Sequence, residues 1–297
     1  MKFTKPSLSI EAQVDLLLSR GLIADRAELA RVLSEISYYR LSGYLFPYRG
    51  DDGKAFSEGT QFTTVFDHYL FDRQLRVLVM DAIERVEVSI KARLVNALTQ
   101  KYGVFAHTAR ANFPDMPADV HRRLMDRIHQ NSDRSKEAFI RHYISKYTSE
   151  TEIPLWMALE VMDFGAMLTI YRHSEQYDKR DIAQAYGLTG RVLESWLVSL
   201  NIVRNICAHH GRLWNKIFAV PPLIPAQKHR PEFHSPQAIR NDRVFAILSI
   251  LRYMLQCIAP QSAWHTRVTN LWITKHPSIP MHSMGIPSYW KEYTLWQ

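Results

Sequence analysis

Apolar residues recur along most of the chain at intervals of three and four, the spacing that places side chains on one face of an α-helix. The members of the clearest stripe are Val79, Ile83, Val86, Ile90, Leu94 and Ala97. We find no convincing run of alternating apolar and polar residues, which would indicate a half-buried strand, and no internal repeat. The pattern therefore predicts an all-α fold.

The longest predicted element is a helix from Thr63 to Tyr102, which contains no glycine or proline before Gly103. Three acidic residues in it each precede a basic residue by four positions, the favourable order for ion pairs on a helix. The pairs are Asp72–Arg76, Asp81–Arg85 and Glu87–Lys91. A straight helix of this length would span about 60 Å, so we expect a break or a bend within it.

Shorter helices are predicted on both sides of this element. Ser9–Arg20 and Asp25–Ser37 come before it, and Asp25 with Glu28 resembles a capping box. The aromatic segment Ser37–Gly50 is interrupted by glycine and proline and is predicted as a packed turn. The later helices are expected at Ala118–Asn131, Ser135–Tyr147, Pro154–His173, Lys179–Tyr186, Gly190–His210, Arg240–Ile258 and Gln261–Lys275.

We divide the chain into a helical N-terminal segment (1–60), a helical core (61–219) and a C-terminal loop with helices packed on the core (220–297). Val220–Pro236 is predicted as a long loop. No run approaches the ~18 apolar residues of a membrane span. The N-terminus lacks the apolar region of a secretory signal. Only Cys207 and Cys257 occur, so a disulfide framework is not expected. These features predict a cytoplasmic protein that does not enter a membrane.

Charge adds a class of partner to this picture. The formal net charge is +8 and the isoelectric point is about 9.4. An excess of this sign attracts polyanions, nucleic acid above all, by long-range attraction and counterion release. The alternative is a basic protein with scattered lysine and arginine residues, and the charge by itself leaves both open.

The predicted helix Gly190–His210 carries two apolar stripes. One runs through Val192, Trp196, Leu200, Val203 and Cys207, and is expected to face the core. A second stripe joins Val198 and Ile202 to Asn205 and His209. A helix with two such faces is buried twice, which favours a homodimer with a composite site at the second stripe. Gly211 is expected at the left-handed position that ends the helix.

The end of this helix also carries the candidate chemistry. Asn205 and His209 are neighbours one turn apart, and Arg204 can reach the same side. The helix dipole favours a cationic imidazole in the last turn. Arginine neutralises phosphate oxygens and histidine moves protons near neutral pH, so the group suits a phosphodiester. The alternative is a capping histidine beside a surface arginine.

Other charged groups have weaker claims. On the long helix, Glu84 and Lys91, with the neighbouring Arg85 and Glu87, either line the same cleft or form a solvated face. His68 and Asp72 have the spacing of two metal ligands, but no second pair is nearby in sequence, so no metal site is predicted. Arg40 and Tyr44 are expected to pack. The basic residues of the later loop either contact RNA or are solvated; they are Lys228, His229, Arg230, Arg240 and Arg243.

Four segments in order resemble one family. RNICAHHGRLWN (204–215) is similar to the HEPN-superfamily signature of arginine, a polar residue, three others and histidine. SYYRLSGYLFPYR (37–49), YLFDRQLRVLVMDAIERVEVSIKARL (69–94) and Trp156–Tyr171 resemble further motifs of its Abi-like, or abortive-infection, family. The resemblance covers Ile36–Asn215 and implies a HEPN-like helical bundle with additional N- and C-terminal helices.

That resemblance implies a metal-independent endoribonuclease without a cofactor, acting as a toxin or in phage defence. Arg204 would bind the scissile phosphate, His209 would act as acid or base, and Asn205 would orient either. His210, Arg212 and Asn215 are assigned supporting or RNA-binding roles with Glu84 and Lys91. The products would carry 2′,3′-cyclic phosphate and 5′-hydroxyl ends. The alternative is a non-catalytic RNA-binding or scaffolding module, and an antitoxin or a non-coding RNA partner stays open.

Overall fold

The computed structural model describes residues 2, 6–50 and 53–297, and in these residues the regular structure is entirely helical. The only β pairings there are two isolated bridges, Ile23 with Gln61 and Arg49 with Phe56. The predicted all-α fold is confirmed. None of the described helices combines the length and the apolar character that crossing a bilayer requires.

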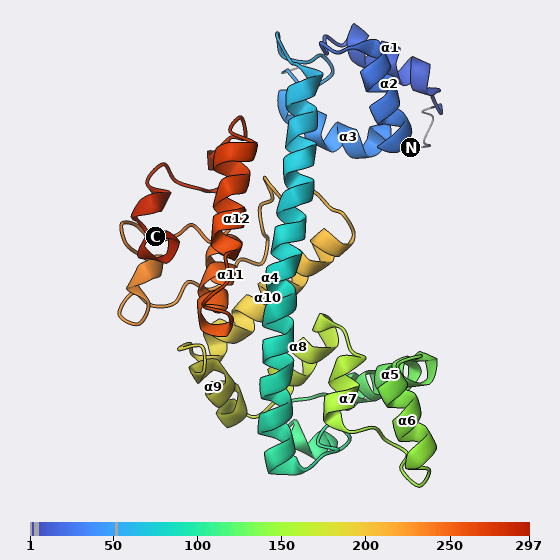
Figure 1. The fold of residues 1–297 in the computed structure, drawn as a ribbon, viewed down its shortest axis with the longest axis vertical. Helices are drawn as coiled ribbons and strands as arrows, with labels where there is room; N and C mark the ends of the chain where they lie inside the picture. Colours follow the sequence, from blue (N-terminus) through green and yellow to red (C-terminus); the bar gives the residue numbers. More distant parts are fainter. Residues whose placement is uncertain (1, 3–5, 51–52) are drawn as a thin grey trace.

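One long helix, α4 (Phe62–Tyr102), runs through most of the molecule (Figure 1). The other α-helices are α1 (Ile10–Ser19), α2 (Arg26–Glu35), α3 (Tyr38–Leu45), α5 (Ala118–Arg134), α6 (Ala138–Lys146), α7 (Leu155–Glu160), α8 (Phe164–His173), α9 (Gln176–Gln184), α10 (Gly190–Ala208), α11 (Val244–Ile258) and α12 (Trp264–Asn270). A π-helical turn, Leu271–Lys275, continues α12. Short 3-10 turns lie at Phe46–Tyr48, Arg110–Asn112, Pro231–Phe233, Met281–Met284, Trp290–Glu292 and Thr294–Trp296.

Helix α4 is continuous over 41 residues, so the expected break is wrong. Its apolar stripe is buried from Val79 to Leu94, as its helical spacing predicted. The three predicted ion pairs form: Arg85 Nη2 lies 3.0 Å from Asp81 Oδ1, Lys91 Nζ lies 2.8 Å from Glu87 Oε1, and Arg76 contacts Asp72. The helix ends at Gly103, whose positive φ of 83° favours glycine.

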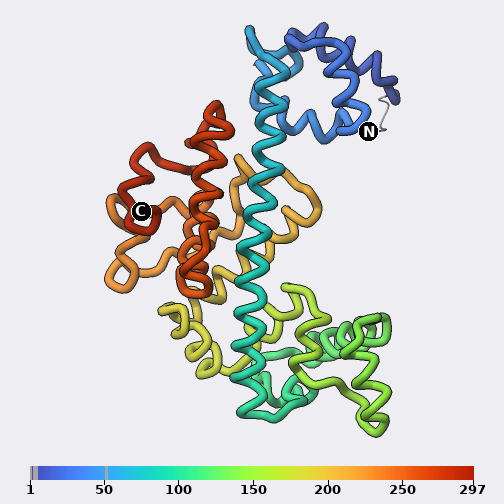
Figure 2. The backbone as a smooth tube through the Cα atoms, in the orientation of Figure 1, coloured from blue at the N-terminus to red at the C-terminus, as the bar shows by residue number. Residues whose placement is uncertain are grey.

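The remaining helices are arranged along α4 (Figure 2). Helices α1–α3 lie at its N-terminal end, and α5–α8 lie near its C-terminal end. Helices α9–α11 pack along its length, with the C-terminal segment on the outer side of α11. Helix α11 is apolar on nearly all sides, and it is buried between α4 and the aromatic C-terminal segment, where Phe245 stacks on Trp296. This arrangement makes α4 the common support of the N-terminal helices and of α10.

Several predicted elements differ from the structure in kind or in their bounds; helix α11, for example, begins at Val244 and not at the predicted Arg240. The segment after Ser37 is the helix α3 and not a turn, because the Ser37 side chain accepts from the backbone N–H of Arg40 and starts a helix. The predicted helix Pro154–His173 is two helices, because the Asp163 side chain caps a new start at Ala166 N–H. Helix α9 begins three residues before the predicted Lys179 and ends two residues before the predicted Tyr186.

Candidate functional site

Helix α10 positions the predicted site. Thr189 caps its start through the N–H of Val192. The first predicted stripe is buried from Trp196 to Cys207, with Val192 only partly buried. Burial raises the pKa of the Cys207 thiol to about 12. This thiol is therefore held in its neutral form, and it is a packing residue rather than a nucleophile.

The end of α10 has the geometry of a Schellman motif, with a histidine at the left-handed position. His209 is the C-cap, and His210 follows with a φ of 56°. The N–H of His210 donates to Cys207 O at 3.0 Å, and that of Gly211 donates to Ile206 O at 2.7 Å. These are the two hydrogen bonds that close this motif. Gly211 was expected at the left-handed position but lies one residue beyond it.

The catalytic candidates gather at this end. Asn205, His209 and His210 are exposed, and Arg204 is half-buried. Arg204 Nη1 lies 3.5 Å from Asn205 Oδ1, at the limit of a hydrogen bond. The exposed end of α10 thus presents a guanidinium, an amide and two imidazoles on consecutive turns. Such a group can bind a phosphate and exchange protons with it.

Beneath these exposed side chains lies a buried carboxylate, Asp72 of α4. It accepts hydrogen bonds from the backbone N–H groups of Leu213 (3.1 Å) and Trp214 (2.8 Å) and from Tyr44 Oη (2.6 Å). Arg76 donates to it as well. These donors fit an ionised carboxylate, which only accepts. Asp72 therefore holds the segment that follows α10.

Three arginines fix the rest of the turn. Arg76 Nη1 donates to Gly211 O at 3.2 Å, and Arg40 Nη1 donates to His210 O at 2.6 Å. In the opposite direction, Arg212 of the turn donates to Gly43 O of α3. The turn after α10, residues 210–214, is therefore tied to both α3 and α4, and we refer to it as the clamped turn.

Burial and charge oppose each other in this network. Burial has the larger effect on the Asp72 carboxyl and raises its pKa above the usual value. Arg76, Tyr44 and the two backbone N–H groups act in the opposite direction. Burial also acts to lower the pKa of Arg76, but Asp72 and Tyr44 outweigh it and keep the guanidinium charged. A buried pair of this kind requires all of its partners, because an unpaired buried charge is costly.

The supporting residues that the sequence predicted have mixed positions. Arg212 lies in the clamped turn, and Asn215 follows it, half-buried. Lys91 is bound to Glu87 and to Met162 O (2.8 Å), which places it against the α7–α8 junction. It is 15 residues beyond Arg76, or about 22 Å along α4. Glu84 is exposed two turns beyond Arg76. The structure brings neither Glu84 nor Lys91 to the end of α10.

A metal site is not apparent in the part of the chain that the structure describes, where no group of three or more His, Cys, Asp or Glu side chains could hold an ion. The pair His68 and Asp72 serves packing instead. Asp72 binds the turn after α10. The His68 ring lies edge-on to Trp214, with 5.0 Å between the ring centres, and its nitrogens lie 3.2 Å from Tyr48 Oη.

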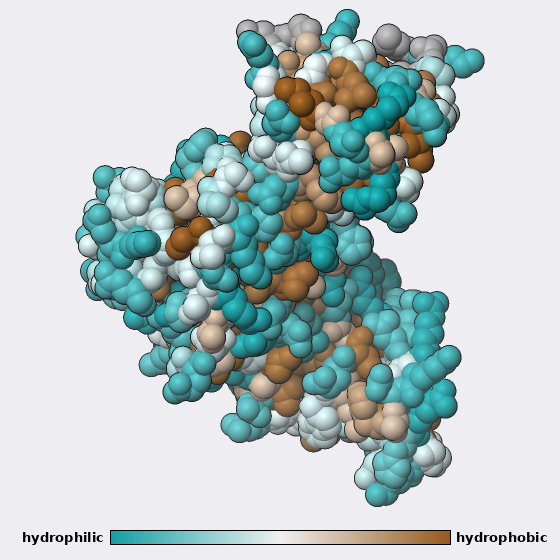
Figure 3. All heavy atoms as spheres, turned by 45° about the horizontal axis from the view of Figure 1, so that its top comes forward, coloured by the Kyte–Doolittle hydropathy of each residue, from teal (hydrophilic) through white to brown (hydrophobic). Residues whose placement is uncertain are grey.

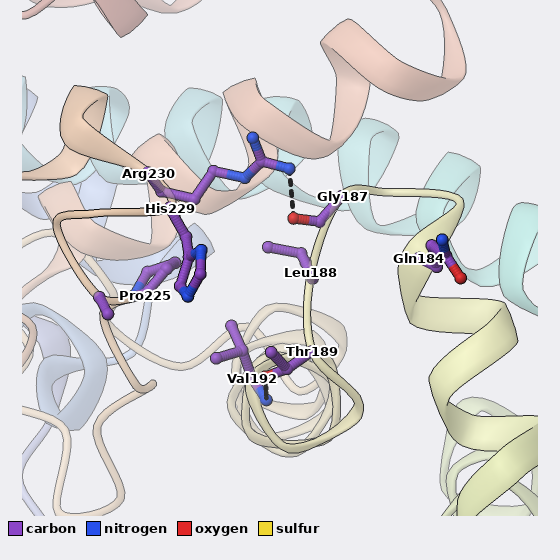
Figure 4. A pocket seen from close by; sticks show the side chains of 9 residues that line it. Gln184, Gly187, Leu188, Thr189, Val192, Pro225, His229 and Arg230 are labelled. Atoms are coloured by element: carbon purple, nitrogen blue, oxygen red, sulfur yellow. Dashed lines mark hydrogen bonds between the residues drawn. The ribbon is translucent and has the colours of Figure 1, made fainter.

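Two basic residues of the later loop, His229 and Arg230, line a cavity of about 520 Å³ at the other end of α10 (Figure 4). Figure 4 shows Arg230 extending to the carbonyl of Gly187, and its guanidinium also lies 5.3 Å from the centre of the Tyr253 ring. Arg240 pairs with Asp242, and Arg243 reaches Ser283 O. Lys228 and His229 are exposed. Most of these cations are therefore engaged in the fold and not collected into one patch.

Sequence reasoning missed the residues that clamp the site. The sequence predicts packing for Arg40 and Tyr44, and for Asp72–Arg76 it predicts only an ion pair that supports the long helix. A signal was present, however. On α4, Asp72 and Arg76 follow the buried spacing that continues to Val79 and Ile83. Charged side chains are almost never fully buried unless they are paired, so their place in this stripe indicates a buried ion pair.

Comparison with known proteins agrees with the motifs that meet here. The model of a family described as Abi-like protein matches residues 31–215, more than half of the chain. This range contains α3, α4 and the clamped turn after α10. The searches of curated proteins and of solved structures each returned no match.

Proposed function

Because the chain belongs to the Abi-like protein family, we propose that it is a phage-defence protein that cuts RNA without a metal ion at the exposed end of α10. One observation carries the proposal. A network from α3 and α4, with the buried Asp72 and Arg76 at its centre, fixes the backbone of residues 210–214 directly after Arg204, Asn205 and His209, while the side chains of these residues and of His210 stay wholly or partly open to solvent. Preorganisation of this kind is what a catalytic group requires.

In the proposed reaction the ribose 2′-oxygen attacks the adjacent phosphorus while the bond from phosphorus to the 5′-oxygen breaks. One proton leaves the 2′-hydroxyl and one reaches the departing 5′-oxygen. His209 supplies one of these transfers, and Arg204 balances the charge of the phosphate oxygens. Asn205 orients the phosphate or the histidine. General acid–base help of this kind is typically worth ~10²–10⁴ in rate.

A single His209 cannot serve as base and as acid at the same moment. The second stripe of α10 suggests where another comes from: Val198 and Ile202 are only partly buried, and Asn205 and His209 continue the stripe in the open. A homodimer formed on this stripe would bring two His209 side chains to one composite site. The dimer is part of the proposal.

The test is to incubate the purified protein with total RNA in EDTA and to identify the new ends by mass spectrometry. We expect cleavage with 2′,3′-cyclic phosphate and 5′-hydroxyl ends. Activity that disappears with EDTA and returns with magnesium would contradict the mechanism. Tight RNA binding with no cleavage of any RNA would favour a non-catalytic RNA-binding module.

A further inference from the structure

Beside the clamped turn, helix α3 presents an aromatic side chain that has no role in the packing of the fold. Tyr39 is 89% exposed. In the described part of the chain, the Tyr39 side chain takes part in neither a ring contact nor a hydrogen bond; the Ser42 hydroxyl donates to the backbone carbonyl of Tyr39 and not to its side chain. A tyrosine in this position buries almost no apolar area, and tyrosine forms helices less readily than leucine or alanine. The ring is therefore free to contact a ligand.

The neighbours of Tyr39 hold its backbone in place. Arg20 Nη1 lies 3.3 Å from Tyr38 Oη, Arg40 binds His210 O, and Tyr44 binds Asp72. These contacts fix α3 against α1, α4 and the turn that carries His210. The exposed ring of Tyr39 therefore projects from a helix that is held in place. Tyr39 is adjacent in sequence to Arg40, which binds the candidate site at His210 O.

The same face of α3 carries a second exposed ring and a cation. Tyr39, Gly43 and Phe46 are at positions i, i+4 and i+7, and so share one side of the helix. Phe46 is 65% exposed, and Arg212 lies against this face at Gly43, the middle of the three positions, where it donates to Gly43 O. The order along this face is therefore aromatic ring, guanidinium, aromatic ring.

Helix α3 lies beside a recess in the molecular surface. Figure 3 shows the surface hollowed between the lobe that holds the N-terminal helices and the lobe of α5–α8. In Figure 1 the C-terminal end of α10 comes out on this side of α4, below α3. An extended ligand lying in the recess can contact the α3 face and the end of α10 together.

We infer that Tyr39 is a stacking platform for an unpaired base of single-stranded RNA, next to the site where the strand is cut. This inference rests on the proposed function and names the form of RNA that the site takes. Rings on which bases stack, beside cations that meet the phosphates, are the usual means of binding single strands. A duplex keeps its bases stacked on each other, so Tyr39 offers it nothing comparable.

The test measures binding in the His209→Ala background, so that the RNA stays intact. The probe is a 12-nucleotide oligouridine RNA with one 2-aminopurine, whose fluorescence falls when the base stacks. Tyr39→Leu keeps an apolar side chain but removes the ring, and it should weaken binding roughly tenfold and abolish the quenching. Tyr39→Trp should keep both. Tyr177→Leu is the matched control, because Tyr177 is 58% exposed on α9, away from the site.

Two results would overturn the inference: wild-type affinity and quenching in Tyr39→Leu, or an equal loss of affinity for a 12-base-pair RNA duplex. A circular dichroism melt of each variant checks that the fold is kept. The outcome for the proposed function is separate. If the wild-type protein cuts no RNA but Tyr39→Leu still loses single-strand binding, the cleavage proposal fails and the platform stands. If RNA is cut and Tyr39→Leu binds normally, the platform fails and the cleavage proposal stands.

Discussion

His210 has a backbone conformation that suits glycine, with a φ of 56°. The left-handed conformation costs other residues on the order of 1–2 kcal/mol. It is the only residue other than glycine with a positive φ in the described parts of the chain, and it lies in the candidate site. Strain of this kind is retained where the surroundings enforce it, and it often marks a functional residue. The clamp on His210 O and Gly211 O is what enforces it here.

His210→Gly should therefore stabilise the fold and harm the activity. Glycine relieves the left-handed strain, so we expect the free energy of unfolding in urea to rise by roughly 0.5–1 kcal/mol. The same change removes an exposed imidazole from the site, so RNA cleavage should fall. His209→Gly is the control, since His209 has a negative φ and should lose stability with this change. Unchanged cleavage in His210→Gly would limit His210 to a structural role.

A second histidine makes a prediction about pH. His107 is completely buried, and neither ring nitrogen has a partner among the described residues. Burial lowers its pKa from 6.5 to about 4, with smaller contributions from the positive charges of His121 and His129. The folded protein thus favours the neutral ring, whereas the unfolded chain binds a proton near pH 6.5. The stability that this difference provides is present above pH 6.5 and is lost as the pH falls towards 4.

Between pH 7 and pH 5, wild-type protein should lose about 2 kcal/mol of unfolding free energy through His107. His107→Leu cannot take up a proton, so its unfolding free energy should fall by that much less over the same interval. Urea titrations of both proteins at the two pH values make the measurement. If wild-type protein and His107→Leu lose the same unfolding free energy between the two pH values, the protonation of His107 does not contribute to the pH dependence of stability.

At the scale of elements, the site is a meeting of three segments far apart in sequence. Asp72 of α4 is 141 and 142 residues from the two N–H groups that it binds, and Arg40 is 170 residues from His210. Helix α4 carries the carboxylate, α3 carries the arginine, and α10 ends in the turn that both hold. The histidines are therefore positioned by elements that contain none of the reacting groups.

Asp72→Asn tests this clamp. It keeps the shape of the side chain but leaves the buried Arg76 without its counter-charge, a loss that typically costs ~3–5 kcal/mol. Chemical unfolding should show that drop, and RNA cleavage should fall with it. Asp119→Asn is the matched control, since Asp119 pairs with Arg123 at the same spacing but in the open, and its midpoint should not move. A wild-type unfolding midpoint in Asp72→Asn would contradict the clamp.

The sequence predicted local elements better than contacts between them. Helix α4 and its three ion pairs follow from intervals of three and four residues within one segment, so periodicity was sufficient. Helix α3 was missed because Gly43 and Pro47 are typical of turns, whereas Ser37 caps a helix that packs on α4. The group Arg204, Asn205 and His209 was predicted from one helix. Its support was not, because nothing local connects Asp72 to Leu213. The division at residues 60 and 219 stays a prediction.

At the scale of the whole molecule, the proposed composite site depends on the formation of a homodimer. Ile202→Asp places a charge in the centre of the partly buried stripe of α10, so it should convert a dimer into a monomer in light scattering. Cleavage should be lost with the dimer. Ile144→Asp is the control, since Ile144 is exposed on α6, outside the stripe. A wild-type monomer at micromolar concentration, with full activity in Ile202→Asp, would rule out the composite site.

The most direct measurement compares wild-type protein with His209→Ala in EDTA, following both the rate of RNA cleavage under single-turnover conditions and the affinity for RNA. His209→Ala should lower the rate by at least ~10²-fold, the scale of lost acid–base help, with nearly unchanged affinity. Arg204→Ala should weaken both, since it removes a phosphate contact as well as charge stabilisation. Cleavage by His209→Ala at the wild-type rate would contradict the account.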